Sequence, residues 1–274
     1  MSKATLTKRI EFCSSHRYHN PIWDNEKNRV IFGPCHNEQS HGHNYLLEAT
    51  IKGEIDPANG MIMNLYDFKR FLLEILGEFD HKHLNLDTPY FAKTIPTTEN
   101  LALTLWRLIE GRMAILELDH IRLYEDDTFY ADIRPQFLQT SSPSDSPQAA
   151  ITRVSRFSAG LRTPSGHLTG HNYTVGVTVC GKIDGETGQV IDLKKLDELI
   201  QTHILDRFHD RELSLDPALE DGPVSEGTLA RSIWSTLKGD ITSGCLAEIS
   251  VSEGVGTEVR LTNDVACRSG YFER

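Results

Sequence analysis

Apolar and polar residues alternate along residues 45–51 of the chain. One side of this segment carries Tyr45, Leu47, Ala49 and Ile51, and the other side carries Leu46, Glu48 and Thr50. A repeat of two residues is the side-chain repeat of a β-strand, so the pattern predicts a strand with one buried face. The segment "IDPANG" that follows contains turn-forming residues and predicts that the chain reverses there.

Helical spacing replaces this alternation after the turn. Between residues 65 and 79 the apolar positions are Leu65, Phe68, Leu72, Ile75 and Phe79. A second helix is expected after "PTTEN", where Thr97 or Thr98 can cap the N-terminus. Its inner stripe is expected to consist of Leu101, Leu105 and Leu108. The segment "IRLYEDDTFYADI" then predicts a strand, a polar turn and a strand, which gives an α+β order of strand, strand, helix, helix, strand, strand.

This pattern occurs twice in the chain. The segment "GHNYLLEATIKGEIDPANGMIMNLYDFK" from Gly42 matches "GHNYTVGVTVCGKIDGETGQVIDLKKLD" from Gly170, and further pairs keep an offset of 127 to 129 residues. Residues 135–150 between the halves are rich in Ser, Pro and Gln, as is typical of a linker. We therefore predict a tandem duplication, with domains in residues 1–134 and 151–274.

Composition restricts the class of protein. A hydrophobic share of 39% and a charged share of 24% are ordinary for a globular protein. The apolar runs are shorter than the ~18 residues of a membrane span, and the N-terminus has no apolar central stretch, so we expect a cytoplasmic protein without a membrane partner. The net charge of -11 argues against a surface that binds nucleic acid. It does not exclude a small anionic substrate, because the local charge of a pocket decides what binds there.

Three histidines are candidate metal ligands. His41 and His43 are two positions apart on a predicted strand, so their side chains share one face, with Cβ atoms about 7 Å apart. Antiparallel pairing with the first predicted strand can bring His16 alongside them. Three neutral imidazoles with one open position are the ligand set of a catalytic zinc site.

The first half, from about Ile10 to Ile133, resembles the family of 6-pyruvoyl-tetrahydropterin and 6-carboxy-tetrahydropterin synthases. The matching motifs, in order, are "SSH", "FGPCHN", "HGHNY", "GEIDPANGMIMNL", "FDHKHLNLDTPYF", "PTTEN" and "YEDD". The resemblance implies a T-fold, with helices on one face of an antiparallel sheet, in homo-oligomers that enclose a tunnel and form active sites at subunit interfaces. It also implies a zinc-dependent lyase of tetrahydrobiopterin biosynthesis that converts 7,8-dihydroneopterin triphosphate to 6-pyruvoyl-tetrahydropterin and triphosphate.

The same resemblance assigns roles to individual residues. His16, His41 and His43 match the Zn²⁺ ligands, and Cys35 matches the general base. Asp80 and His81 match its charge-relay partners, and Glu125 matches the anchor of the pterin ring. The family's other pterin contacts correspond to Thr97, Thr98 and Glu99. These residue types suit the chemistry, since a thiolate can take a proton and a carboxylate can accept two N–H groups of a guanidine-like edge.

The second half has lost most of these residues. Leu161 and Thr169 stand at the positions of His16 and His41, and only His171 remains. His167 is four positions from His171, about 13 Å along a strand and too far to share one zinc ion with it. The retained matches are Ser225, Glu226 and Glu253. We expect a degenerate domain without zinc that completes the oligomer, in which Glu253 is a second candidate anchor for the pterin.

Other functions remain open at this point. The related 6-carboxy-tetrahydropterin synthases of the queuosine pathway typically have a shorter spacing than the five residues between Cys35 and His41. A variant that forms 6-hydroxymethyl-dihydropterin for folate carries a glutamate shortly before the histidine pair, and Glu38 occupies such a position. A non-catalytic pterin-binding protein is the alternative of another class.

Overall fold

The computed structural model describes residues 3–113, 116–139, 145–163, 165–219 and 223–263. These residues form two compact units. The first unit consists of the described residues up to Ala149 together with residues 182–189. The second unit consists of residues 150–181 and the described residues from Val190 onward. Residues 182–189 therefore belong to the second repeat by sequence and to the first unit by their contacts.

The first unit is built on a sheet with the strand order β3-β1-β2-β4-β5. The strands are β1 (Lys3–His16), β2 (His41–Glu54), β3 (Lys82–His83), β4 (Glu117–Asp126) and β5 (Phe129–Ile133). β1 and β2 are antiparallel over their whole length, from Lys3 opposite Glu54 to His16 opposite His41. The short strand β3, which the sequence pattern did not predict, pairs with β1 in parallel.

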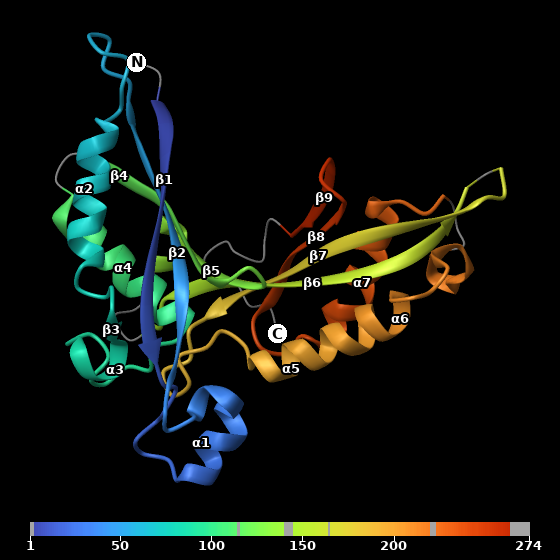
Figure 1. The fold of residues 1–274 in the computed structure, drawn as a ribbon, viewed down its shortest axis with the longest axis horizontal. Helices are drawn as coiled ribbons and strands as arrows, with labels where there is room; N and C mark the ends of the chain where they lie inside the picture. The colour runs from blue at the N-terminus through green and yellow to red at the C-terminus, as the bar shows by residue number, and fades with distance from the viewer. Residues whose placement is uncertain (1–2, 114–115, 140–144, 164, 220–222, 264–274) are drawn as a thin grey trace. The chain divides into compact units, whose positions relative to one another are not determined.

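Two helices cover one face of this sheet, as Figure 1 shows. They are α2 (Leu65–Leu76) and α4 (Thr98–Arg112), with the short helix α3 (Leu84–Asp87) between them. The alternating residues of β2 predicted to be buried are fully buried, and so are the predicted apolar positions of residues 65–79 apart from the exposed Leu65. The helix itself is shorter than predicted, because α2 ends at Leu76 and Phe79 lies beyond it. In α4 the predicted stripe needs one correction, since Leu108 is half-buried and Ile109 takes the inner position. The predicted α+β order is confirmed.

The connection between β1 and β2 contains helix α1 (Asn25–Phe32) and the 3-10 turn η1 (Gly33–His36). Asp24 caps α1 by accepting a hydrogen bond from the backbone N–H of Lys27. The buried Asn28 links α1 to the end of β1, because its side chain accepts from Asn20 N at 2.7 Å and donates to Asn20 O at 2.9 Å. A core of Tyr18, Phe32 and Ile95 holds the segment in place.

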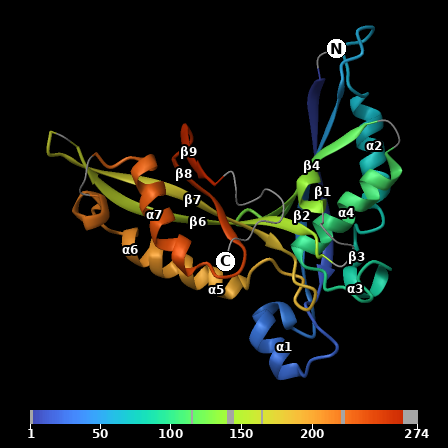
Figure 2. The same cartoon turned by 180° about the vertical axis from the view of Figure 1, so that it is seen from behind.

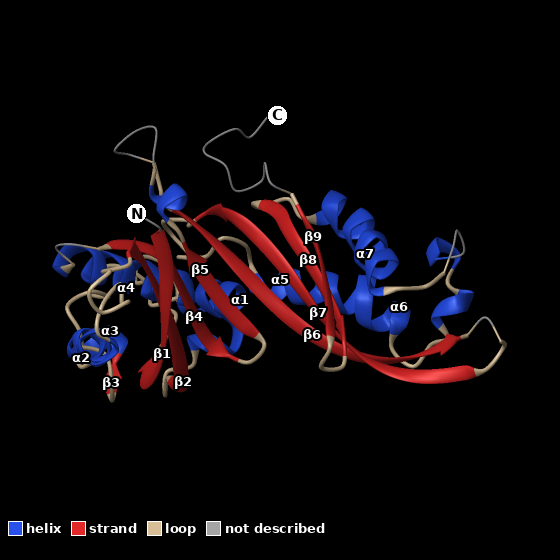
Figure 3. Cartoon of the chain, turned by 90° about the horizontal axis from the view of Figure 1, so that it is seen from above, coloured by secondary structure: helices blue, strands red, loops and turns tan. Residues whose placement is uncertain are grey.

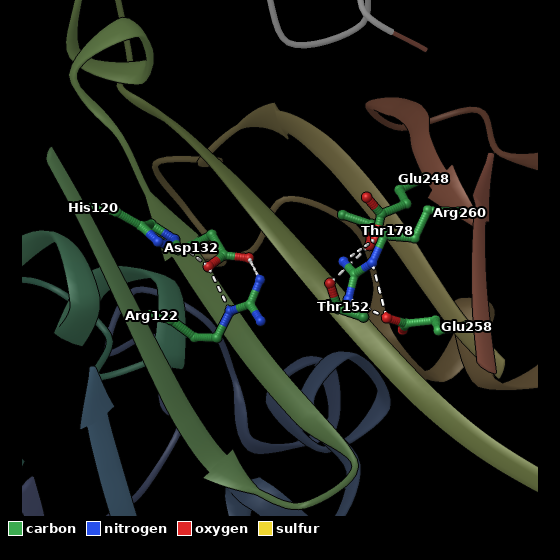
Figure 4. Close-up of polar contacts among 8 residues, drawn as sticks. All are labelled: His120, Arg122, Asp132, Thr152, Thr178, Glu248, Glu258 and Arg260. Atoms are coloured by element: carbon green, nitrogen blue, oxygen red, sulfur yellow. Dashed lines mark hydrogen bonds and ion pairs between the residues drawn. The ribbon is translucent and has the colours of Figure 1, made fainter. Parts of the chain in front are cut away.

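A buried polar cluster joins β4 to β5 (Figure 4). Asp132 is bonded to His120 and, through both carboxylate oxygens, to Arg122. Burial alone would raise the pKa of Asp132, but the hydrogen bonds from His120 and Arg122 outweigh it and lower the pKa. The carboxylate therefore stays charged inside the sheet.

The second unit repeats the scheme with a sheet of order β6-β7-β8-β9. Its strands are β6 (Gln148–Arg162), β7 (Leu168–Lys182), β8 (Cys245–Glu253) and β9 (Thr257–Thr262). Helices α5 (Leu193–Ile200), α6 (Asp206–Phe208) and α7 (Glu226–Asp240) lie on one side of these strands (Figures 2 and 3). A π-helical turn, Gln201–Leu205, joins α5 to α6, and 3-10 turns follow at Leu213–Leu215 and Pro217–Leu219. Among the described residues, no helix is long and apolar enough to cross a membrane.

Gly42 allows β1 and β2 to approach closely beside the predicted metal ligands. A Cβ atom at Gly42 would lie 2.8 Å from Ser14 O, whereas a Cβ at the matching Gly170 meets no atom within 4 Å. We expect Gly42→Ala to lower the free energy of unfolding by about 1–3 kcal/mol, since the strands must move apart. Gly170→Ala, the matched control, should change it by less than about 0.5 kcal/mol. Urea unfolding measures both, and equal effects of the two substitutions would contradict this explanation.

Candidate active site

The register of β1 and β2 brings three imidazoles together. His16 lies directly opposite His41, and His43 follows two positions along the same face. The ring centroids are 4.5 Å apart for His16 and His41, 5.1 Å for His16 and His43, and 4.9 Å for His41 and His43. One ligand nitrogen of each ring lies within 4.8 Å of the other two, so the three can hold one metal ion.

The surroundings of these rings favour metal ligation through Nε2. His16 Nδ1 lies 3.1 Å from Pro96 O, an acceptor that fixes the proton on Nδ1 and leaves the lone pair on Nε2. This Nε2 is 3.0 Å from His41 Nε2. His43 Nε2 is buried and has no hydrogen-bond partner among the described residues. Two nitrogens in close approach and a third without a hydrogen bond from the described residues fit the donor set of a divalent transition metal.

Burial keeps the three rings neutral. It lowers the pKa of His16 to about 3, helped by the neighbouring imidazoles of His41 and His43. Burial also lowers the pKa values of His41 and His43. Because a metal binds only the neutral imidazole, the site is in its ligand form at neutral pH before any ion arrives.

Glu125 lies beside this cluster at the end of β4. Its Oε1 is 3.4 Å from His43 Nε2, and its Oε2 accepts hydrogen bonds from Tyr18 OH at 3.3 Å and from Thr98 Oγ1. Burial raises the pKa of the carboxyl, and the hydroxyl of Thr98 opposes this effect. Among the described residues, two neutral hydroxyls donate hydrogen bonds to this largely buried carboxylate, so an incoming cationic or N–H-rich group would compensate its charge.

The other three residues predicted to contact the pterin lie at the N-terminus of α4. Thr97 is the N-cap of the helix, since its side chain accepts a hydrogen bond from Asn100 N. Thr97, Thr98 and Glu99 are all buried, and the bond from Thr98 joins them to Glu125. These four residues thus form one group next to the three histidines.

Cys35 lies near the same side of the sheet, in the turn η1. Its backbone carbonyl accepts a hydrogen bond from Tyr18 N at 2.8 Å, and its side chain packs against the core that contains Tyr18. The Tyr18 ring lies 4.9 Å from the His16 ring, centroid to centroid. Tyr18 therefore connects the cysteine, the histidines and Glu125. Sequence reasoning missed Tyr18 and Tyr45, although Tyr45 is two positions after His43 on the same face of β2 and Tyr18 is two positions after His16, just beyond the end of β1.

Asp80 and His81 lie elsewhere, beside Cys13. Asp80 Oδ1 accepts from Cys13 N at 3.0 Å and is 3.0 Å from His81 Nδ1, while His81 N donates to Cys13 O at 2.7 Å. Strand alternation puts Cys13 on the face of β1 opposite to His16. His81 lines a surface cavity of about 450 Å³, together with Cys13, Ser15, Asn44, His83 and Asp87. Within this chain the predicted relay pair is therefore next to Cys13.

The second unit presents a different arrangement at the matching positions. His171 forms an ion pair with Glu253 through Nδ1, and its Nε2 lies 2.7 Å from Thr169 Oγ1. Thr169 Oγ1 in turn donates to Leu161 O at 3.0 Å. Both ring nitrogens of His171 are thus engaged within the protein. In the described part of the chain, the three-histidine cluster occurs in the first unit alone. Glu38 is exposed between η1 and β2.

Fold and site together define a class of protein: a two-repeat α+β chain with a three-histidine candidate metal site, in which His16 is buried and His41 and His43 are partly buried, beside a largely buried glutamate. A sequence model of the family described as 6-pyruvoyl tetrahydropterin synthase matches residues 5–136 and again residues 150–263. The chain belongs to this family and contains its domain twice.

Individual relatives match one repeat. The 6-pyruvoyl tetrahydrobiopterin synthases of Pongo abelii and Homo sapiens are 43% and 42% identical over 126 residues, which is 46% of this chain and 87% of each relative. The solved structure of Caenorhabditis elegans 6-pyruvoyl tetrahydropterin synthase is 29% identical, with a TM-score of 0.44, over 46% of this chain and 91% of that chain.

The low pKa of His16 predicts how the metal-free chain responds to acid. The unfolded chain protonates this residue near pH 6.5 and the folded chain only near pH 3, so its contribution to stability is present above pH 6.5 and is lost as the pH falls below it. The loss should approach about 1.4 kcal/mol per pH unit for this one group. In His16→Leu, which copies Leu161 of the second repeat, the free energy of unfolding should fall less steeply with decreasing pH, by up to about 1.4 kcal/mol per pH unit. Urea unfolding with a chelator from pH 7.5 to 5 measures the slopes, and identical slopes would contradict the assignment.

Proposed function

We propose that this chain is a zinc-dependent lyase that converts 7,8-dihydroneopterin triphosphate to 6-pyruvoyl-tetrahydropterin and triphosphate. The observation that carries the proposal is the group of three neutral histidines, buried at His16 and partly buried at His41 and His43, next to Glu125 and the N-terminus of α4. Membership of the family and the names of its similar relatives support the same reaction. The substrate is a small anionic pterin triphosphate.

His16, His41 and His43 would hold the zinc ion, with one position left for substrate oxygen atoms. When bound, zinc would supply a Lewis acid that makes the C–H next to a side-chain hydroxyl of the substrate more acidic. Cys35, as a thiolate, takes that proton. The half-buried position of Cys35, close to Tyr18 on the side of His16, supports this role.

Glu125 would bind the pterin ring. A carboxylate accepts two N–H groups from the guanidine-like edge of the ring in a charge-assisted pair, which selects pterins and fixes their orientation. Tyr18 and Thr98 hold one oxygen of this carboxylate, so its direction is set before the substrate arrives. Thr97 and Glu99 complete the pterin end of the site.

Asp80 and His81 would act as a proton relay for the cysteine of a neighbouring subunit. Their position beside Cys13, on the opposite face of β1 from His16, supports an active site shared between chains, in which the pair of one chain faces Cys35 of another. The active form is then a homo-oligomer. Asp80 orients the imidazole and stabilises its protonated form.

Residues 1–134 form the catalytic domain of this proposal and residues 135–150 the linker. Residues 151–274 form a degenerate domain that lacks the zinc ligands and completes the oligomer. The bonds of His171 to Glu253 and Thr169 support a second domain without zinc. Both ring nitrogens of the one matching histidine that this repeat retains already have partners within the protein.

The product formed from dihydroneopterin triphosphate by the zinc-loaded chain tests the reaction, with identification by mass spectrometry. We expect 6-pyruvoyl-tetrahydropterin, and a fall in rate of roughly 10²-fold or more in Cys35→Ala, because the proton acceptor is lost. A carboxy-pterin would assign the related queuosine-type reaction. If the product is a hydroxymethyl-pterin and Cys35→Ala still forms it, the role of general base would be assigned to Glu38 instead of Cys35. Binding of pterin without turnover would identify a non-catalytic protein.

Separate substitutions of Glu125 and Glu253 by Gln test the anchor. Glu125→Gln should weaken neopterin binding by roughly 10- to 100-fold, since it removes the charged acceptor from the pair. Equilibrium fluorescence titration of the zinc-loaded chain measures the dissociation constants. A comparable loss of neopterin affinity in Glu253→Gln would show that both repeats supply an anchor. Unchanged neopterin affinity in Glu125→Gln would show that Glu125 is not the anchor.

A further inference from the structure

Residues 184–189, "DGETGQ", form a tight turn between β7 and α5. Asp184 N donates to Gln189 O at 3.0 Å, and Gly188 N donates to Asp184 O at 2.8 Å. The Asp184 side chain accepts from the backbone N–H groups of Glu186 and Thr187 and from the Thr187 hydroxyl. The turn is thus closed by its own hydrogen bonds, and it belongs to the first unit although it comes from the second repeat.

This turn is bonded to two buried residues of the first repeat. Thr97 Oγ1 donates to Gly188 O at 2.6 Å, and Asn20 Nδ2 donates to Glu186 O at 3.0 Å. The contact leaves no room for a side chain, since a Cβ atom at Gly188 would lie 2.6 Å from Asn100 Nδ2 and 3.1 Å from Thr97 Cγ2. The turn is therefore fitted closely to the N-terminus of α4.

The two residues that the turn contacts adjoin the two hydroxyl donors of Glu125. Thr97 directly precedes Thr98, and Asn20 is two positions after Tyr18. Thr98 and Tyr18 both donate to Glu125 Oε2. Asn20 also holds Asn28 of α1, the helix that leads into the turn with Cys35.

The same turn in the first repeat is exposed. Residues Asp56–Met61 repeat its hydrogen bonds, with Asp56 N donating to Met61 O at 2.9 Å and Gly60 N donating to Asp56 O at 2.7 Å. Gly60 and Gly188 share a φ of +73°, but a Cβ atom at Gly60 meets nothing within 4 Å. The receiving residues also differ, because Val224 and Gly227 stand at the positions of Thr97 and Asn100 in the second repeat. The first repeat thus has a hydroxyl, that of Thr97, that can donate to such a turn. The second repeat has the apolar Val224 at that position.

We propose that the turn Asp184–Gln189 of the second repeat positions the pterin-binding end of the first-repeat site. It acts through Thr97 and Asn20 on the hydroxyls of Thr98 and Tyr18, which direct the Glu125 carboxylate toward the ring. The inference rests on the proposed function, because it assigns the bound ring to a pterin. It gives the degenerate repeat a role in substrate affinity that needs no metal and none of its own catalytic residues.

Gly188→Ala and Gly60→Ala, each in the full zinc-loaded chain, form a matched test. Both place a Cβ at φ +73° in the same turn, so backbone strain is equal and only the neighbours differ. We expect Gly188→Ala to raise the dissociation constant of neopterin and the KM for dihydroneopterin triphosphate by roughly tenfold or more, since small displacements of a positioning group are costly. Zinc content should be unchanged, and Gly60→Ala should match the wild type. Equal effects of the two substitutions, or no effect of Gly188→Ala, overturn the proposal.

Asn20→Asp provides the second variant in case Gly188→Ala does not fold. It keeps the oxygen that accepts from Ile22 N at 3.0 Å and removes the donor to Glu186 O. The expected result is a higher KM and weaker neopterin binding, with kcat within roughly twofold of the wild type. A loss of kcat or of soluble protein with unchanged neopterin affinity would show a merely structural role and overturn the proposal. A wild-type chain that binds neopterin without lyase activity would reject the proposed function alone, and the binding comparison would still decide this inference.

Discussion

The antiparallel register of β1 and β2 is the constraint on which the site depends. It sets His16 opposite His41 and places His43, Tyr45 and Ser14 on the same face. A slip of one residue would turn the histidines of one strand to the opposite face. Gly42 permits the close approach of the strands at this point, and the burial that follows keeps the rings neutral. The convergence of the three rings and their neutral state therefore both depend on this alignment.

The two repeats show how one backbone can support different chemistry. Both keep the two long strands and the turn that follows them, with Gly60 and Gly188 in the same conformation. Leu161 and Thr169 replace two ligands in the second repeat, and the remaining His171 is bound by Glu253. The second repeat nevertheless keeps the turn that contacts Thr97. The second repeat has thus lost two of the three candidate metal ligands and kept this turn.

Much of the fold and part of the site follow from the sequence. The alternation in β2 and the spacing in α2 predict their buried faces, and strand pairing predicts that the histidines converge. Local periodicity does not predict contacts between distant segments, such as the bond from His16 to Pro96 or the path that brings Asp80 to Cys13. Nor does it predict that residues 182–189 pack in the first unit. These features depend on tertiary packing.

The number of metal ions bound per chain is the sharpest test of the three-histidine site. We predict one zinc ion per chain, held by His16, His41 and His43, and none in the second repeat. Mass spectrometric metal analysis of the purified chain should therefore give one zinc per chain in the wild type. His41→Thr, which copies Thr169, should reduce that value to near zero. Two ions per chain in the wild type, or an unchanged zinc content in His41→Thr, would contradict the account.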